Sequence, residues 1–199
     1  HTDMIDCFES LRAKGDRKFH FVAPPGSGKT IIGLEMLRRL GNKAVVFSPN
    51  QAIQSQWITK LTDISDTFKA SDNPESEADL LSLTYQIIST KDSDGSMHEN
   101  AKKILELIKE RKTIILDECH HLTAWWAEVM NRIAKEGVYI IGLTATPPID
   151  KGAKDWNVYL KLLGPVDYEI PFPPIVKDGF LAPFQDLIWI TEPTSAEIE

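Results

Sequence analysis

The sequence predicts an α/β protein with a doubly wound, mainly parallel sheet that carries helices on both faces. Two observations predict this class. Short apolar runs recur along the chain, and several are continuous rather than alternating, as strands covered on both faces are. Helix-like stretches lie between them, and such alternation implies right-handed crossovers between parallel strands. Ligands of these sheets bind beyond the carboxyl ends of the strands, so functional side chains are expected there.

The first element is a helix over residues 2–14, because Met4, Phe8 and Leu11 share one face and Gly15 ends the pattern. The expected strands are Phe19–Ala23, Ala44–Ser48, Leu80–Tyr85, Thr113–Asp117 and Val138–Thr144. The expected helices between them are Ile31–Leu40, Ala52–Leu61, Ala101–Glu110 and Ala124–Lys135.

The remaining segments are predicted to be irregular. Ala70–Glu77 and Lys91–Asn100 are rich in Ser, Asp and Asn, which is typical of solvated loops. The tail from Gly164 carries many prolines, which exclude a long helix, and Asp186–Thr191 is a candidate for one more strand. Residues 1–199 are therefore expected to form one domain.

Composition sets the broad class. The chain is 42% hydrophobic and 26% charged, and no apolar run approaches the length of a membrane span, so no membrane partner is expected. Its net charge of −7 argues against a strongly basic nucleic-acid surface, although local Lys and Arg residues decide that affinity. Two cysteines, Cys7 and Cys119, make no disulfide framework and favour the cytoplasm, or the nucleus of a eukaryote.

A phosphate-binding loop is predicted at Ala23-Pro-Pro-Gly-Ser-Gly-Lys-Thr30, between an apolar run and a helix-like run. The glycines let backbone N–H groups point at phosphate oxygens, and the helix that follows adds the positive end of its dipole. We expect Lys29 to reach the β- and γ-phosphates and the Thr30 hydroxyl to hold Mg²⁺. The predicted nucleotide-binding residues are Pro25, Gly26, Ser27, Gly28, Lys29 and Thr30.

A second apolar strand ends in two carboxylates, Asp117 and Glu118. Asp117 fits the role of holding Mg²⁺ through water, and Glu118 that of orienting the attacking water, so both join Lys29 as predicted catalytic residues. A zinc site at Cys119–His121 was the alternative. Neighbouring residues at a strand end point in opposite directions, and the chain has no second ligand pair, so Mg²⁺ is the expected metal.

Two further features, a turn with two hydroxyls and a basic cluster, can each be interpreted as functional or as purely structural. Gly142–Pro147 presents the hydroxyls of Thr144 and Thr146 where another strand stops, and taken alone this is a capped turn. A basic cluster precedes the Asp117 strand, and a solvated helix face explains it better than contact with DNA does. The cluster consists of Lys102, Lys103, Lys109, Arg111 and Lys112.

In this order the segments resemble the superfamily 2 helicases and translocases. The matching segments are Ala23–Thr30 (motif I), Ser48–Trp57 (motif Ia), Thr84–Gln86 (motif Ib), Asp117–His120 (motif II) and Thr144–Thr146 (motif III). The resemblance implies a RecA-like ATP-binding domain that uses ATP and Mg²⁺. Gln56-Trp57, Thr84–Gln86 and the stretches 163–170 and 177–183 are similar to the DNA-repair helicase and type III restriction motor branch, which indicates DNA.

The resemblance also implies roles beyond the phosphate site. His120, Thr144 and Thr146 would couple the nucleotide state to the grip on DNA. The residues expected near the DNA backbone are Pro49, Gln56, Thr84 and Tyr85. Backbone contacts carry little sequence information, so no sequence specificity is expected.

These inferences predict the N-terminal motor lobe of an ATP-dependent DNA helicase or translocase. The family's second RecA-like lobe and its arginine finger are expected to be absent from this chain, because no Arg follows Arg132; the isolated lobe should therefore hydrolyse ATP poorly. One alternative is a P-loop phosphotransferase for small molecules, which the Asp-Glu-x-His segment disfavours. The other is a nucleotide-gated scaffold that docks a partner on Trp125 and Trp126, which the intact Lys29, Asp117 and Glu118 disfavour.

Overall fold

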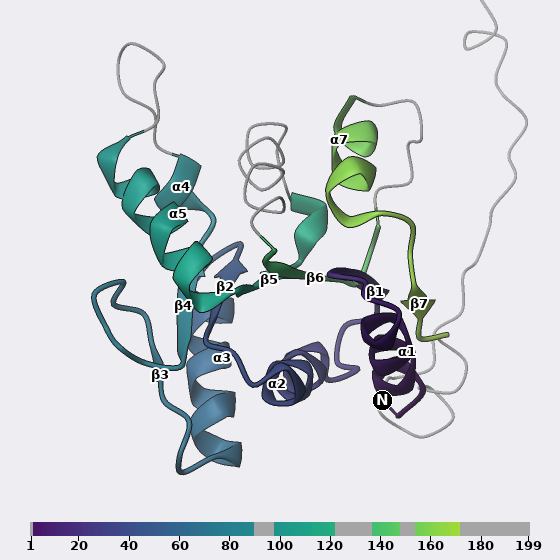
Figure 1. The fold of residues 1–199 in the computed structure, drawn as a ribbon, viewed down its shortest axis with the longest axis horizontal. Helices are drawn as coiled ribbons and strands as arrows, with labels where there is room; N and C mark the ends of the chain where they lie inside the picture. Colours follow the sequence, from purple (N-terminus) through teal and green to yellow (C-terminus); the bar gives the residue numbers. More distant parts are fainter. Residues whose placement is uncertain (1, 90–97, 122–136, 148–153, 172–199) are drawn as a thin grey trace, which may run out of the picture.

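Seven strands form one parallel sheet in the order β3-β4-β2-β5-β6-β1-β7 (Figure 1). The computed structural model describes residues 2–89, 98–121, 137–147 and 154–171. Within them the strands are β1 Lys18–Val22, β2 Ala44–Ser48, β3 Ala70–Ser71, β4 Leu80–Thr84, β5 Thr113–Asp117, β6 Tyr139–Thr144 and β7 Tyr168–Glu169. The predicted fold class, a doubly wound and mainly parallel sheet, is confirmed.

Helices cover both faces of this sheet. The described helices are α1 Thr2–Ala13, α2 Lys29–Leu40, α3 Gln51–Ile64, α4 Gln86–Ser89, α5 Glu99–Arg111, the 3₁₀ turn η1 Cys119–His121 and α7 Lys154–Leu163. In Figure 1, α1, α2 and α3 lie below the sheet, and α4, α5, η1 and α7 lie above it. Two buried apolar clusters fill the spaces between the layers, one on each face.

Local chemistry sets the limits of the helices that frame the site. Gly41 ends α2 in a left-handed conformation with φ 66°, and its N–H donates to the Leu37 carbonyl. Asn50 caps α3, because its side-chain oxygen accepts the N–H of Ile53 at 3.0 Å. α3 begins shortly after β2 ends at Ser48, whereas α2 begins at Lys29, after the loop that follows β1.

Strand register brings the functional segments to one edge. Ser48 is paired with Thr84, Val22 with Thr144, and Asp117 with Leu143. Because all these strands run in parallel, their carboxyl ends form a single row, from which the loops to α2, α3, α4 and η1 leave. The motifs of the sequence are thus gathered along this edge.

Several elements differ from the sequence-based prediction. β3 lies inside the predicted loop Ala70–Glu77, where Ala70 and Ser71 pair with the start of β4, and α5 begins at Glu99 inside the predicted loop Lys91–Asn100. β7 and α7 were not predicted at all. The predicted helix Ala124–Lys135, with Trp125 and Trp126, and the predicted strand Asp186–Thr191 lie outside the described residues.

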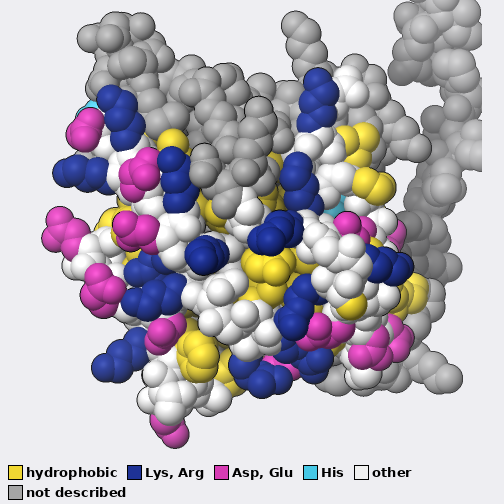
Figure 2. All heavy atoms as spheres, viewed as in Figure 1, with side chains coloured by type: hydrophobic (Ala, Val, Ile, Leu, Met, Phe, Trp, Pro, Cys, Tyr) yellow, Lys and Arg dark blue, Asp and Glu magenta, His cyan; other side chains and the backbone are white. Residues whose placement is uncertain are grey.

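The basic cluster before β5 separates into two kinds of residue. Lys102 and Lys109 form ion pairs with Glu99 and Glu106 one turn earlier, at 3.6 and 3.0 Å, as on a solvated helix face. Figure 2 likewise shows Asp and Glu side chains among the Lys and Arg side chains of this face. Arg111 corrects the prediction: it is only 5% exposed and donates to backbone carbonyls, so it belongs to the interior. No helix in the described ranges is long and apolar enough to cross a membrane.

Candidate active site

The loop between β1 and α2 has the geometry that phosphate binding requires. Gly26 and Gly28 adopt φ of 75° and 81°, a left-handed conformation that side chains disfavour. Gly28 directly precedes α2, so the loop N–H groups and the positive end of the helix dipole lie together. Lys29 and Thr30 then form the first turn of the helix.

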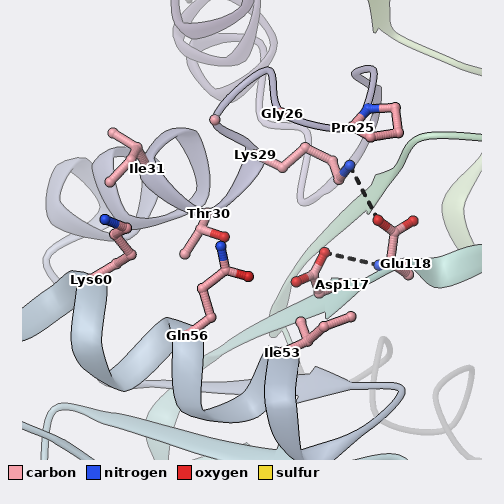
Figure 3. A pocket seen from close by; sticks show the side chains of 11 residues that line it. Pro25, Gly26, Lys29, Thr30, Ile31, Ile53, Gln56, Lys60, Asp117 and Glu118 are labelled. Atoms are coloured by element: carbon pink, nitrogen blue, oxygen red, sulfur yellow. Dashed lines mark hydrogen bonds and ion pairs between the residues drawn. The ribbon is translucent and has the colours of Figure 1, made fainter. Parts of the chain in front are cut away.

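A cavity of about 300 Å³ opens beside this loop. It is lined by Pro25, Gly26, Gly28, Lys29, Thr30, Ile31, Ile53, Gln56, Lys60, Asp117 and Glu118. Figure 3 shows that Lys29, Thr30, Asp117 and Glu118 converge on it from α2 and from the end of β5. Of the predicted nucleotide-binding residues only Ser27 is outside this lining; it is buried, with 5% of its surface exposed.

Lys29 and Glu118 form an ion pair across the cavity, with Nζ and Oε1 3.1 Å apart. The ammonium also donates to the Ala23 carbonyl at 3.3 Å, and the other carboxylate oxygen of Glu118 accepts the N–H of Ala145 at 3.3 Å. Glu118 has φ 49°, which is costly for a residue with a side chain, by about 1–3 kcal/mol. This backbone turn aims consecutive carboxylates, Asp117 and Glu118, into one cavity.

Asp117 is held more firmly than any other acid of the cavity. It is 3% exposed, and its Oδ2 accepts the indole N–H of Trp57 at 2.7 Å while its Oδ1 accepts the N–H of Glu118 at 3.0 Å. Burial raises the pKa of this carboxyl, as does Glu118, whereas the Trp57 bond and Lys29 lower it. The two fixed hydrogen bonds leave the carboxylate in a defined orientation.

The oxygens at this end of the cavity fit Mg²⁺. The Thr30 hydroxyl, on a side chain that is 8% exposed, and the Asp117 carboxylate both line it. Mg²⁺ prefers six oxygens and usually keeps several waters and phosphate oxygens, so two protein oxygens are a typical share. Cys119 lies elsewhere: it is buried against Tyr159, with its pKa raised to about 12 by burial, whereas His120 faces Thr144.

The three predicted coupling residues form a hydrogen-bonded row that begins at Glu118. His120 Nδ1 lies 3.4 Å from Glu118 Oε2 and 2.7 Å from the Thr144 hydroxyl. The same hydroxyl accepts the N–H of Thr146 at 3.2 Å. The structure therefore places all three residues together, on the side of Glu118 away from the phosphate loop.

The four predicted DNA-contact residues do not lie together. Pro49 and Thr84 are neighbours at the ends of β2 and β4, where Gln86 donates to the Pro49 carbonyl at 3.3 Å. Gln56 instead lines the nucleotide cavity. Tyr85 is 7% exposed and its hydroxyl donates to the Asp117 carbonyl at 2.9 Å, so its side chain is directed into the protein and contacts the acidic end of the site.

Sequence reasoning missed three residues of α3. Ile53 and Lys60 line the cavity, and Trp57 bonds to Asp117. Their spacing of three and four residues places them with Gln56 on one helix face, which was a signal in the sequence. What that face would meet depended on the packing of α3 beside α2, which no spacing reveals.

The comparisons decide the family. The family described as "Type III restriction enzyme, res subunit" matches residues 2–149. The chain belongs to this family. The match confirms the resemblance to superfamily 2 helicases and favours a motor lobe over a small-molecule phosphotransferase.

Curated proteins and solved structures are also similar to this chain. The chain is 28% identical over 176 residues to the general transcription and DNA repair factor IIH helicase/translocase subunit XPB2 of Arabidopsis thaliana, covering 82% of this chain and 22% of that protein. It spans between 22% and 31% of the first three curated relatives. The fold is similar to the UvsW helicase of bacteriophage T4 (TM-score 0.58, 16% identity, 77% of this chain and 55% of that one). It is also similar to the Hef helicase domain of Pyrococcus furiosus (TM-score 0.57, 20% identity, 81% of this chain and 36% of that one).

Proposed function

We propose that this res-subunit family chain is the ATP-binding lobe of a DNA helicase or translocase, which couples ATP hydrolysis to movement on DNA or to its unwinding. The observation that supports this most is the convergence of Lys29, Thr30, Asp117 and Glu118 on one cavity. An ammonium, a hydroxyl and two acids, beside a glycine loop at a helix N-terminus, provide the groups that a metal-bound triphosphate needs.

The Lys29–Glu118 ion pair gives the first step of the mechanism. A triphosphate entering the cavity carries more negative charge than one carboxylate, so Lys29 would exchange Glu118 for phosphate oxygens. Glu118 is then free to accept a proton from the attacking water, while the Ala145 N–H holds its second oxygen. Mg²⁺, held by Thr30 and Asp117, would supply charge neutralisation at the β- and γ-phosphates.

The coupling row gives Glu118 a connection to the rest of the lobe. His120 Nδ1 lies near both the Glu118 carboxylate and the Thr144 hydroxyl. A change in the position of Glu118 would therefore change which of the two is the hydrogen-bond partner of His120. Thr144 and Thr146 end β6 and begin the next loop. We propose that these residues transmit the nucleotide state to the DNA-binding side.

DNA is the proposed polymer, with the half-buried Pro49 and Thr84, at the carboxyl ends of β2 and β4, as backbone contacts. One solved structure with a similar fold, the SWI2/SNF2 ATPase core of Sulfolobus solfataricus, is in complex with dsDNA (TM-score 0.54, 18% identity, 81% of this chain and 35% of that one). We propose that residues 1–199 form one lobe and that a second RecA-like lobe closes over the cavity in the working protein. The proposed setting is the cytoplasm or nucleus, consistent with the free Cys7 and Cys119.

Glu118→Gln tests this function. The change removes the proton acceptor, so in the working protein, which carries the second lobe, ATP turnover stimulated by DNA should fall by about 10²–10⁴-fold. It also removes the negative partner of Lys29, so Mg-nucleotide affinity should stay equal or rise. ATPase assays with DNA and with RNA, together with titration of a fluorescent nucleotide, measure both effects.

Glu106→Gln is the matched control for this experiment, because Glu106 is an exposed acid on α5, outside the cavity. Unchanged turnover in Glu118→Gln would overturn the catalytic assignment. It would leave the nucleotide-gated scaffold as the better interpretation, since binding without Glu118-dependent hydrolysis is what a scaffold does.

A further inference from the structure

Two aromatic side chains, neither of them in the cavity lining, donate hydrogen bonds to Asp117. The indole Nε1–H of Trp57 in α3 donates to the carboxylate at 2.7 Å, and both groups are buried. The Tyr85 hydroxyl, at the end of β4, donates to the Asp117 backbone carbonyl at 2.9 Å. The Trp57 bond fixes the carboxylate of Asp117, and the Tyr85 bond fixes its backbone carbonyl.

Trp57 is also wedged against the helix that carries Thr30. A Cβ at Gly33 of α2 would lie 2.6 Å from Cη2 of Trp57, so only glycine allows this approach. Gly33 is one turn after Lys29 and Thr30. Trp57 therefore contacts both the helix that carries Thr30, at Gly33, and the carboxylate of Asp117, and so links the two elements whose side chains would hold the metal.

Tyr85 is fixed in a comparable way. Its backbone N–H donates to the Ser48 carbonyl at 3.0 Å, and its ring stacks on Phe47 with centroids 6.2 Å apart. It thus joins the ends of β2 and β4 to the end of β5. The sequence segments resembling motifs Ia and Ib both reach Asp117 through these two residues.

We propose that Trp57 and Tyr85 are positioning residues for metal binding, acting through Asp117 without touching the nucleotide. This inference rests on the proposed Mg-nucleotide function of the cavity. The plain alternative is that both are ordinary core aromatics, since both are buried in the apolar clusters. The two interpretations predict different results when a single N–H or O–H is lost: the first predicts weaker metal binding, and the second predicts lower stability only.

Tyr85→Phe removes the hydroxyl alone, whereas Trp57→Phe removes the indole N–H together with the part of the indole that contacts Gly33. Positioning of a metal ligand typically changes metal affinity by about 10–100-fold. We expect the affinity for Mn²⁺, measured by electron paramagnetic resonance with bound ADP, to fall within that range in Trp57→Phe and by a smaller factor in Tyr85→Phe. The affinity for ADP in EDTA should change by less than about twofold, because neither side chain lines the cavity.

Leu61→Ala is the matched structural control. Leu61 lies one turn after Trp57 on α3, is 5% exposed and packs in the same cluster, but it does not line the cavity. This change should lower the urea midpoint and leave Mn²⁺ affinity unchanged. If Trp57→Phe lost ADP affinity in EDTA as much as Mn²⁺ affinity, or if Leu61→Ala lost Mn²⁺ affinity equally, the core interpretation would hold instead.

A spectroscopic readout tests Trp57 directly. The indole N–H signal that disappears from the ¹⁵N–¹H spectrum in Trp57→Phe should move in Asp117→Asn and when Mg²⁺ is added to the ADP complex. In the Asp117→Asn background, Trp57→Phe should cause no further loss of Mn²⁺ affinity. An additive loss, or an indole signal that ignores both changes, contradicts the proposal.

Binding by the unmodified protein distinguishes failure of the proposed function from failure of the positioning role. If the unmodified protein binds neither ADP nor Mn²⁺-ADP, the cavity is not a nucleotide site. If it binds both and Trp57→Phe behaves like the unmodified protein, only the positioning role is overturned.

Discussion

At the residue scale, a buried histidine in β1 has a lowered pKa, which favours its neutral form. His20 in β1 is 0% exposed, and its Nδ1 lies 3.1 Å from the Gly164 carbonyl, to which it must donate. Nε2 therefore accepts from the Tyr159 hydroxyl at 2.6 Å, and that hydroxyl lies 3.5 Å from the protonated thiol of Cys119. Burial lowers the pKa of His20, although Gly164, Asp167 and Pro165 act in the opposite direction.

This residue predicts a pH dependence of stability. With the folded pKa below the unfolded value of about 6.5, the unfolded chain takes up the proton first as pH falls. The neutral ring thus contributes stability that is fully present above about pH 6.5 and is lost as pH falls toward the folded pKa. Between pH 7.5 and 5.5 the free energy of unfolding should fall, by at most about 1.4 kcal/mol for this single group.

Urea unfolding at several pH values checks this expectation, with His20→Gln as the comparison. The variant should be less stable at neutral pH, but its stability should depend less on pH in this window. If the free energy of unfolding depended on pH equally in both proteins, a group other than His20 would be responsible for the pH dependence.

At the element scale, α5 is fastened to the segment before β4 by one side chain. Arg111, in the last turn of α5, donates to the carbonyls of Ala78 at 2.5 Å and Ser76 at 2.9 Å. The guanidinium fork satisfies two carbonyls at once, which an ammonium at the same place cannot do with the same geometry. This explains how a charged residue becomes part of the interior.

We predict that Arg111→Ala lowers the free energy of unfolding by about 2–4 kcal/mol, because it leaves buried carbonyls without a donor. Arg111→Lys should recover less than half of this loss. Lys102→Ala and Lys109→Ala on the same helix should each cost under about 1 kcal/mol, since their ion pairs are exposed. Urea titration of the four variants measures the order; equal losses in all of them would refute the internal role of Arg111.

Element prediction succeeded where the pattern was local. β2 and β5 begin and end at the predicted residues, β4 and β6 differ by one residue at one end, and β1 is shifted by one residue at both ends. Continuous apolar runs predict these strands because their two faces are covered. β3 and β7 have two residues each, too few for any period to show. They exist because they pair with β4 and β1, and pairing partners are not visible in a single sequence.

At the scale of the whole molecule, the parallel sheet brings segments that are far apart in the sequence together at one edge. The predicted phosphate-loop and acidic residues meet because their strands end at the same edge, which the alternation of elements already implied. The cavity position of Gln56 and the bonds that Trp57 and Tyr85 make to Asp117 were not predicted, because they depend on contacts between elements that are distant in sequence. Trp57 and Asp117 are sixty positions apart, and only the packing of α3 against α2 brings them together.

The central claim is that Lys29, Thr30, Asp117 and Glu118 surround one polyanion. A crystal structure of the protein with Mg²⁺ and a non-hydrolysable ATP analogue tests it most directly. We expect the β- and γ-phosphates in the cavity of about 300 Å³, with the Lys29 ammonium moved from Glu118 to a phosphate oxygen and the metal between Thr30 and Asp117. A nucleotide bound elsewhere, with the 3.1 Å ion pair between Lys29 and Glu118 still intact, would contradict the account.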